Sequence, residues 1–212
     1  NSCENLLASL PIEIKIKLNK LAISGTSGTL IASNLQGEPL GEAIPYDQAC
    51  SRNKMIIDSM TIGEDHLQTP YSSLAKALTL INKYGENILL RHQSDWITGW
   101  FLKDWTYGEE GNNLKLGWDL KKESWPKSYL NTSWGKCLPQ IIKSGKIIGQ
   151  VNFDIAERFK LNKKLILISG TTDSNASLIA AGLGKEDGLT VLGTTIVVKK
   201  VIDNPIKKQG IT

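Results

Sequence analysis

The sequence predicts an α/β protein, because short apolar runs of strand length are mixed with segments of helical periodicity along its 212 residues. Hydrophobic residues make up 41% of the chain and charged residues 22%, which allows a sizeable buried core. In residues 165–195, an apolar run ends in a glycine turn, an acid opens a helix, and a second apolar run ends in Gly-Thr-Thr. This order predicts a site at the carboxyl end of a sheet.

Charge and cysteine content narrow the class of protein. The net charge of +4 is mild and the lysines are scattered, so we expect no nucleic-acid partner. No apolar run is long enough to span a bilayer, and none resembles a signal peptide, so we expect no membrane association. Cys3, Cys50 and Cys137 fit neither a metal-ligand pattern nor a disulfide framework. The sequence therefore predicts a cytoplasmic protein without a metal site of its own, and it leaves the oligomeric state open.

The first quarter of the chain predicts a helical segment followed by a strand, a turn and a strand. Apolar residues at helical spacing over 3–21, interrupted by Pro11, indicate a short helix and a second amphipathic segment. The elements expected next are a strand at 21–23, a small-residue turn at 24–29, a strand at 30–32, a hairpin turn at 34–37 and a return strand ending at 43–46.

A helix over 71–81 is the clearest element in the middle of the chain. Leu74, Leu78 and Ile81 fall on one face of it, and Ser72 or Ser73 is its expected cap. The other elements expected are a strand at 88–90, a buried helix at 95–105, a polar loop at 107–113, short helices around Trp118, Trp125 and Trp134, a turn between short strands at 138–149, a helix at 153–159, a basic loop at 160–164, a strand at 165–168, a helix at 174–181 and one or two strands over 189–201.

Asp173 is the acid in the turn of the 165–195 stretch, and it has two compatible interpretations. As a helix N-cap, its carboxylate would accept a backbone N–H. As a general base, it would take a proton from a substrate hydroxyl. Gly193-Thr194-Thr195 is likewise either an ordinary strand end or a phosphate clamp of amides and hydroxyls. The sequence contains no Gly-x-x-x-x-Gly-Lys-[Ser/Thr], so a P-loop nucleotide site is not supported.

The remaining polar candidates have structural interpretations of equal or greater weight. Tight-turn packing explains the glycine- and hydroxyl-rich run 24–29 as well as ligand contact does. Asp47 is more typical of a solvated loop than of a hydroxyl-binding site. His66 and His92 are far from each other in the sequence and from any cysteine pair, so we expect structural roles for both. Asp95 is expected to cap the helix that it opens.

Taken together, these stretches resemble the FGGY family of carbohydrate kinases, in the family's order and over nearly the whole chain. The segments that carry the resemblance are Ile23-Ser24-Gly25-Thr26-Ser27-Gly28, Tyr71-Ser72-Ser73-Leu74-Ala75-Lys76, Leu138-Pro139 with Gly145 and Gly149, Ser169-Gly170-Thr171-Thr172-Asp173 and Leu192-Gly193-Thr194-Thr195. Residues 25–29 and 92–96 are most similar to the D-ribulose-kinase-like branch.

The resemblance implies a ribonuclease-H-like, actin-type ATPase fold, incomplete in this chain. It implies ATP-dependent phosphorylation of a hydroxyl of a small sugar, a ketopentose such as D-ribulose or D-xylulose, with Mg²⁺ offsetting charge. Asp173 matches the family's catalytic base. Ser27 matches a sugar-contacting position, and Thr26 and Tyr71 are its neighbours in the implied sugar site. The positions implied for the ATP phosphates are Gly193, Thr194 and Thr195.

The sequence also departs from the family pattern. The family's Trp-x-Asp-x-Arg segment appears here as Tyr46-Asp47-Gln48-Ala49-Cys50, with the acid displaced and the arginine absent. Its Asp-x-Gly-Thr phosphate segment and most of its C-terminal domain are missing. We therefore expect an internal fragment, inactive alone, with most of the N-terminal domain in 1–188 and the start of the C-terminal domain in 189–212. The alternative is a non-catalytic sugar-binding or regulatory module on the same scaffold.

Overall fold

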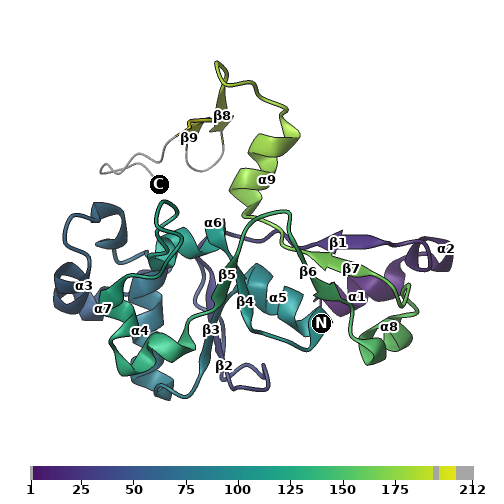
Figure 1. The fold of residues 1–212 in the computed structure, drawn as a ribbon, viewed down its shortest axis with the longest axis horizontal. Helices are drawn as coiled ribbons and strands as arrows, with labels where there is room; N and C mark the ends of the chain where they lie inside the picture. Colours follow the sequence, from purple (N-terminus) through teal and green to yellow (C-terminus); the bar gives the residue numbers. More distant parts are fainter. Residues whose placement is uncertain (1, 193–195, 204–212) are drawn as a thin grey trace.

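The structure, a computed structural model, describes residues 2–192 and 196–203 and has the α/β architecture that the sequence predicts. One sheet has the strand order β1-β7-β6, with β1 at Lys20–Ala22, β7 at Ile166–Ile168 and β6 at Ile147–Gln150. β7 pairs in parallel with β1 and antiparallel with β6. The chain between β1 and β7 is thus inserted between two strands that lie side by side (Figure 1).

Helices near this sheet bury an apolar cluster against it. They are α1 (Ser2–Ser9) and α8 (Phe153–Phe159), at the same end of the molecule as β1, β6 and β7 (Figure 1). The short helix α2 (Ile12–Lys15) lies at this end too, but its isoleucines are exposed. Leu165 and Leu167 are fully buried beside Phe159. α8 has the bounds that the sequence predicts, and its Asn152 cap accepts a hydrogen bond from Asp154 N at 3.0 Å.

A second apolar cluster surrounds α4 (Ser73–Tyr84). The predicted face of Leu74, Leu78 and Ile81 is buried. Ser72 is the cap, since its Oγ accepts a hydrogen bond from Ala75 N at 3.2 Å. α4 packs on the antiparallel pair of β2 (Leu30–Ser33) and β3 (Leu89–His92). The other helical elements of this part are η1 (Ser51–Asn53), α3 (Lys54–Met60) and η2 (Asp65–Leu67).

Residues 107–113 do not form the predicted polar loop. Tyr107–Glu109 is β4, which pairs in parallel with β5 (Gln140–Ile142), and Glu110–Asn113 is α6. The Glu109 carboxylate accepts hydrogen bonds from Gly111 N at 2.8 Å and Asn112 N at 2.7 Å, so the last residue of the strand starts the helix. The prediction was wrong because a three-residue strand and a single helical turn are too short for periodicity to reveal.

Two predicted elements are shorter than expected. The helix predicted at 95–105 is α5 (Gln93–Leu102), which ends where Lys103 adopts a left-handed φ of 56°. The return strand predicted to end at 43–46 is reduced to two isolated antiparallel bridges to β2, from Pro39 to Ser33 and from Ile44 to Leu30. The region around the tryptophans forms short helices, as predicted: η3 (Leu114–Leu116), α7 (Lys127–Leu130) and η4 (Ser133–Cys137).

The C-terminal elements stand apart from both clusters (Figure 1). They are α9 (Asp173–Ala180) and the antiparallel hairpin of β8 (Gly188–Leu192) and β9 (Ile196–Lys200). The structure describes every residue of α9, and none of them is buried. Lys199 connects the hairpin to α9, because its Nζ donates hydrogen bonds to Ser174 O and, at 3.1 Å, to Ser177 Oγ.

Candidate functional site

Two turns meet at the carboxyl ends of the parallel strands β1 and β7. The turn at 24–29 follows β1, and the turn at 169–172 follows β7. Gly25 and Thr172 form a parallel bridge, and Asp173 N donates a hydrogen bond to Gly25 O at 2.9 Å. The pairing that continues past the strand ends therefore places Asp173 directly beside the small-residue turn.

Asp173 does not cap α9. The cap is Thr172, whose Oγ1 accepts a hydrogen bond from Asn175 N at 3.1 Å, and Asp173 is the first residue of the helix itself. Its Oδ1 accepts a hydrogen bond from Ser174 N at 2.7 Å. The side chain is exposed, and the N-terminal end of α9 favours its negative charge. The capping interpretation of Asp173 is therefore wrong, and its carboxylate is exposed beside the turn at 24–29.

Gly170 makes the close approach of the two turns feasible. A Cβ at this position would lie 1.9 Å from Ile23 O, a backbone atom that cannot swing aside. We expect Gly170→Ala to lower the free energy of unfolding by about 3 kcal/mol, measured by urea denaturation. Gly149→Ala is the control, since a Cβ there would meet only the tip of the Leu102 side chain at 3.2 Å. Equal losses in both variants would contradict this account of Gly170.

Lys115, in η3, reaches the same turn from another part of the chain. Its Nζ donates a hydrogen bond to Ser27 O at 3.2 Å. Gly28, with a φ of +97°, lies under the side chain, where a Cβ would be 3.3 Å from Lys115 Cδ. Burial lowers the pKa of Lys115, and the nearby Asp173 carboxylate acts in the opposite direction. The sequence analysis did not select Lys115. Its only distinguishing feature in the sequence is its position between Leu114 and Leu116, which does not indicate a role.

Lys76 ties the turn to two further segments. It is fully buried on α4, and its Nζ donates hydrogen bonds to Gly28 O at 3.0 Å, Tyr46 O at 3.0 Å and Tyr71 O at 2.8 Å. Burial lowers the pKa of Lys76 to about 8. The Tyr71 side chain is 51% exposed. Through this one ammonium group the structure brings Tyr71 close to the turn that carries Thr26 and Ser27.

Side-chain hydrogen bonds also hold Thr26 in place. Thr26 Oγ1 lies 2.7 Å from Thr29 Oγ1 and 3.3 Å from Gln93 Oε1, at the start of α5. Ser27 is half-buried. The structure therefore brings Thr26, Ser27, Tyr71 and Asp173, which the sequence analysis selected, to one region. Gly193, Thr194 and Thr195, the phosphate-binding candidates, lie outside the described residues.

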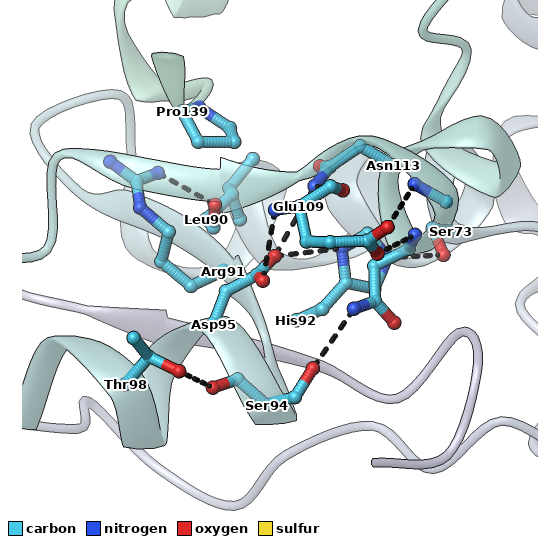
Figure 2. A network of polar contacts seen from close by, with 12 residues as sticks. Ser73, Leu90, Arg91, His92, Ser94, Asp95, Thr98, Glu109, Asn113 and Pro139 are labelled. Atoms are coloured by element: carbon cyan, nitrogen blue, oxygen red, sulfur yellow. Dashed lines mark hydrogen bonds and ion pairs between the residues drawn. The ribbon is translucent and has the colours of Figure 1, made fainter. Parts of the chain in front are cut away.

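A buried polar network lies behind the turn (Figure 2). The prediction that Asp95 caps α5 was wrong. Its Oδ1 accepts a hydrogen bond from Glu109 N at 3.0 Å, and its Oδ2 accepts one from Asn113 Nδ2 at 3.2 Å. Burial raises the pKa of Asp95 to about 7, and the nearby Glu109 carboxylate adds to this. Its carboxylate thus links the start of α5 to β4 and α6.

His92 completes this network as a structural residue, as predicted. Its Nε2 is 2.9 Å from Ser73 Oγ, at the start of α4, and its Nδ1 is 3.8 Å from Asp95 Oδ2. Burial lowers the pKa of His92 to about 3, and the nearby Lys76 ammonium adds to this, so the ring is neutral at physiological pH. The network fixes how α4, α5 and α6 meet beneath the turn.

Within 2–192 and 196–203, no group of three or more His, Cys, Asp and Glu side chains is arranged to hold a metal ion. No helix in the same ranges is both long and apolar enough to cross a membrane.

Comparisons with known proteins point to sugar kinases. No family model matches the sequence. The xylulose kinase of Lactococcus lactis subsp. lactis (strain IL1403) is 25% identical over 215 residues, covering 92% of this chain and 42% of that protein. The solved xylulose kinase from Lactobacillus acidophilus matches with a TM-score of 0.82 at 16% identity, covering 96% of this chain and 44% of that one. Plasmodium falciparum glycerol kinase with ADP matches with a TM-score of 0.76 at 18% identity, covering 92% and 43%.

These matches establish the fold. The chain has part of the actin-type ATPase fold of the sugar kinases, as the resemblance implied. It spans less than half the length of each of these relatives.

Proposed function

We propose that this chain is the sugar-binding part of an ATP-dependent carbohydrate kinase that phosphorylates a hydroxyl of a ketopentose, D-xylulose or D-ribulose. The observation that carries the proposal is the position of the exposed Asp173 carboxylate beside the hydroxyl-bearing turn at 24–29. Similarity to xylulose kinases supports the substrate class. The sequence of the turn favours D-ribulose as the other ketopentose to test.

Each group around the turn has a role in this reaction. The hydroxyls of Thr26 and Ser27 bind sugar hydroxyls, and Tyr71 borders the sugar. Asp173 accepts the proton of the attacking sugar hydroxyl. The oxygen of that hydroxyl bonds to the γ-phosphorus of ATP, the bond from this phosphorus to the bridging oxygen breaks, and ADP leaves. Mg²⁺ accompanies ATP and offsets its charge. In this proposal Gly193, Thr194 and Thr195 hold the phosphates of ATP.

Phosphoryl transfer belongs, in this proposal, to a longer protein. Residues 1–188 correspond to most of the N-terminal domain of such a kinase, and 189–212 to the start of its C-terminal domain. The coverage of 42–44% of the xylulose kinases supports this assignment. The chain by itself is expected to bind sugar without turning over ATP.

The proposal is tested by two measurements. Isothermal titration calorimetry of the chain with D-xylulose, D-ribulose and glycerol tests binding. We expect a saturable binding signal for a ketopentose. Sugar-dependent ADP release from a protein containing this chain and the remaining kinase domain tests catalysis. ADP release without a preference for ketopentoses would overturn the substrate class. Sugar binding without ADP release in the longer protein would overturn the kinase assignment and leave a sugar-binding module.

Lys115 offers a test of how the turn is held. In Lys115→Met, Ser27 O loses its donor, so we expect the KM for sugar to rise about tenfold while kcat changes less. Lys122→Met is the matched control, because Lys122 is an exposed lysine whose ion-pair partner, Asp119, is on its own loop at 3.7 Å. An unchanged KM in Lys115→Met would show that the contact with Ser27 does not position the sugar.

A further inference from the structure

A cavity of about 550 Å³ lies away from the turn at 24–29, none of whose residues lines it. It is lined by Leu89 and Arg91 of β3, by the segment after α5, and by residues of η4, of β5 and of the short link that joins them. His92, at the other end of β3, faces Ser73 and the turn instead. A volume of this size is typical of small-molecule sites.

Arg91 is the charged wall of this cavity. The residue is 3% exposed, and its donors bind backbone carbonyls: Nε bonds Trp105 O at 2.5 Å, and Nη1 bonds Leu90 O at 2.7 Å and Cys137 O at 2.9 Å. No carboxylate of the described residues lies within ion-pair distance of it, and Nη2 donates to no described atom. Figure 2 shows the guanidinium pointing away from the Asp95 carboxylate. The guanidinium is thus fixed by neutral acceptors and lacks a direct ion pair, and the Asp95 and Asp104 carboxylates act on its charge only from a greater distance.

Two lysines add to the positive charge that Arg91 gives this cavity. Lys103 and Lys136 are exposed at its rim, against a single acid, Asp104. Asp104 Oδ1 is already engaged by Thr106 N at 2.9 Å and Thr106 Oγ1 at 2.6 Å. Burial lowers the pKa of Arg91 to about 10, so it remains a cation at neutral pH. The lining thus favours a ligand with more than one negative charge.

The apolar part of the lining is rigid. Trp105 is buried, its Nε1 donates to Trp96 O at 3.0 Å, and its ring lies against Gly37 and Gly99, where a Cβ would come within 2.3 Å of it. Leu89 and Leu138 line the same cavity. A fixed apolar wall beside a buried cation suits an organic group that carries a phosphate, because neither Trp105 nor Arg91 needs to be ordered on binding.

We propose that this cavity binds a small organic phosphate, with its phosphate on Arg91, Lys103 and Lys136 and its organic part against Trp105. The site is separate from Asp173 and does not depend on the kinase assignment.

Isothermal titration with phenyl phosphate tests the proposal, because this probe combines a phosphate with an apolar ring. We expect single-site binding, weaker binding of inorganic phosphate and none of phenol. Lys103→Gln and Lys136→Gln should each weaken binding about threefold, and Asp104→Asn should strengthen it about twofold, which is typical of exposed charges. Lys17→Gln, an exposed lysine outside the cavity, should leave the affinity unchanged.

The location of the bound probe is checked by ¹H–¹⁵N NMR. We expect phenyl phosphate to shift the indole N–H signal of Trp105, and Asp173→Asn to leave both the shift and the affinity unchanged. Absence of binding would overturn the proposal. So would equal weakening by Lys17→Gln, which would indicate nonspecific attraction, or shifts confined to residues near Asp173.

Discussion

Asp173→Asn is expected to lower kcat for sugar phosphorylation by about a thousandfold, while the affinity for sugar changes by less than about threefold. The amide keeps the oxygen that accepts the hydrogen bond from Ser174 N, so the start of α9 is preserved. It cannot accept the proton of an attacking hydroxyl at neutral pH. Single-turnover ADP formation in a protein that contains the whole kinase, combined with sugar titration, separates the two effects.

The matched control for this variant is Asp154→Asn. Asp154 is also an exposed acid in the first turn of a helix, α8. This helix follows Gln150, which pairs with the first residue of β7, whereas the turn at 24–29 lies beyond the last residues of β1 and β7. We expect its kcat to be unchanged. Normal turnover in Asp173→Asn would rule out Asp173 as the base. An equal loss of sugar affinity would instead assign it a binding role.

Asp95→Asn has the second large expected effect, on the pH dependence of stability. The folded protein raises the pKa of Asp95 from 3.8 to about 7, so between these values the folded state binds a proton that the unfolded state has released. In the wild type, this group therefore lowers the free energy of unfolding as pH rises from 4 to 7. Asparagine removes the titration. The stability of the variant relative to wild type should rise by about 4 kcal/mol over this window.

The informative quantity is the difference in the free energy of unfolding between Asp95→Asn and wild type, because His92 changes the stability of both proteins with pH in the opposite direction. Its folded pKa of about 3 lies below its ordinary value of 6.5, so its contribution increases stability as pH rises from 3 to 6.5. Both proteins share this slope, and the charges of Glu109 and Arg91 that act on residue 95 are present in both. Urea denaturation at pH 4, 5, 6, 7 and 8 gives the difference. A constant difference across the series would show that Asp95 is ionised in the folded state throughout.

Local signals in the sequence were sufficient for elements that depend on neighbouring residues. The Ser72 cap and α8 follow from contacts within four residues, and both were predicted. The two strands expected around Gly145 are also present. However, β5 pairs with β4, and β6 pairs with β7, so the pairing of these neighbouring strands could not be read from their own pattern.

The site was predicted only where a motif marked it. Asp173, Thr26, Ser27 and Tyr71 lie in one region, although their roles remain predictions. Lys76 and Lys115 were not assigned roles, because each acts on a carbonyl far away in sequence: 48 residues separate Lys76 from Gly28, and 88 separate Lys115 from Ser27. Asp95 was assigned to a cap because the residues that bind it, Glu109 and Asn113, lie in a segment expected to be a loop.

The absence of any buried residue from α9, all of which the structure describes, has a consequence for how Asp173 is held. Burial of apolar side chains is what gives a helix its resistance to local opening, so the amides of α9 should exchange with solvent far faster than those of α4. Asp173 itself is bonded to the turn at 24–29, because its N–H donates a hydrogen bond to Gly25 O. We therefore expect the amide of the proposed base to exchange more slowly than the amides of the α9 residues that follow it.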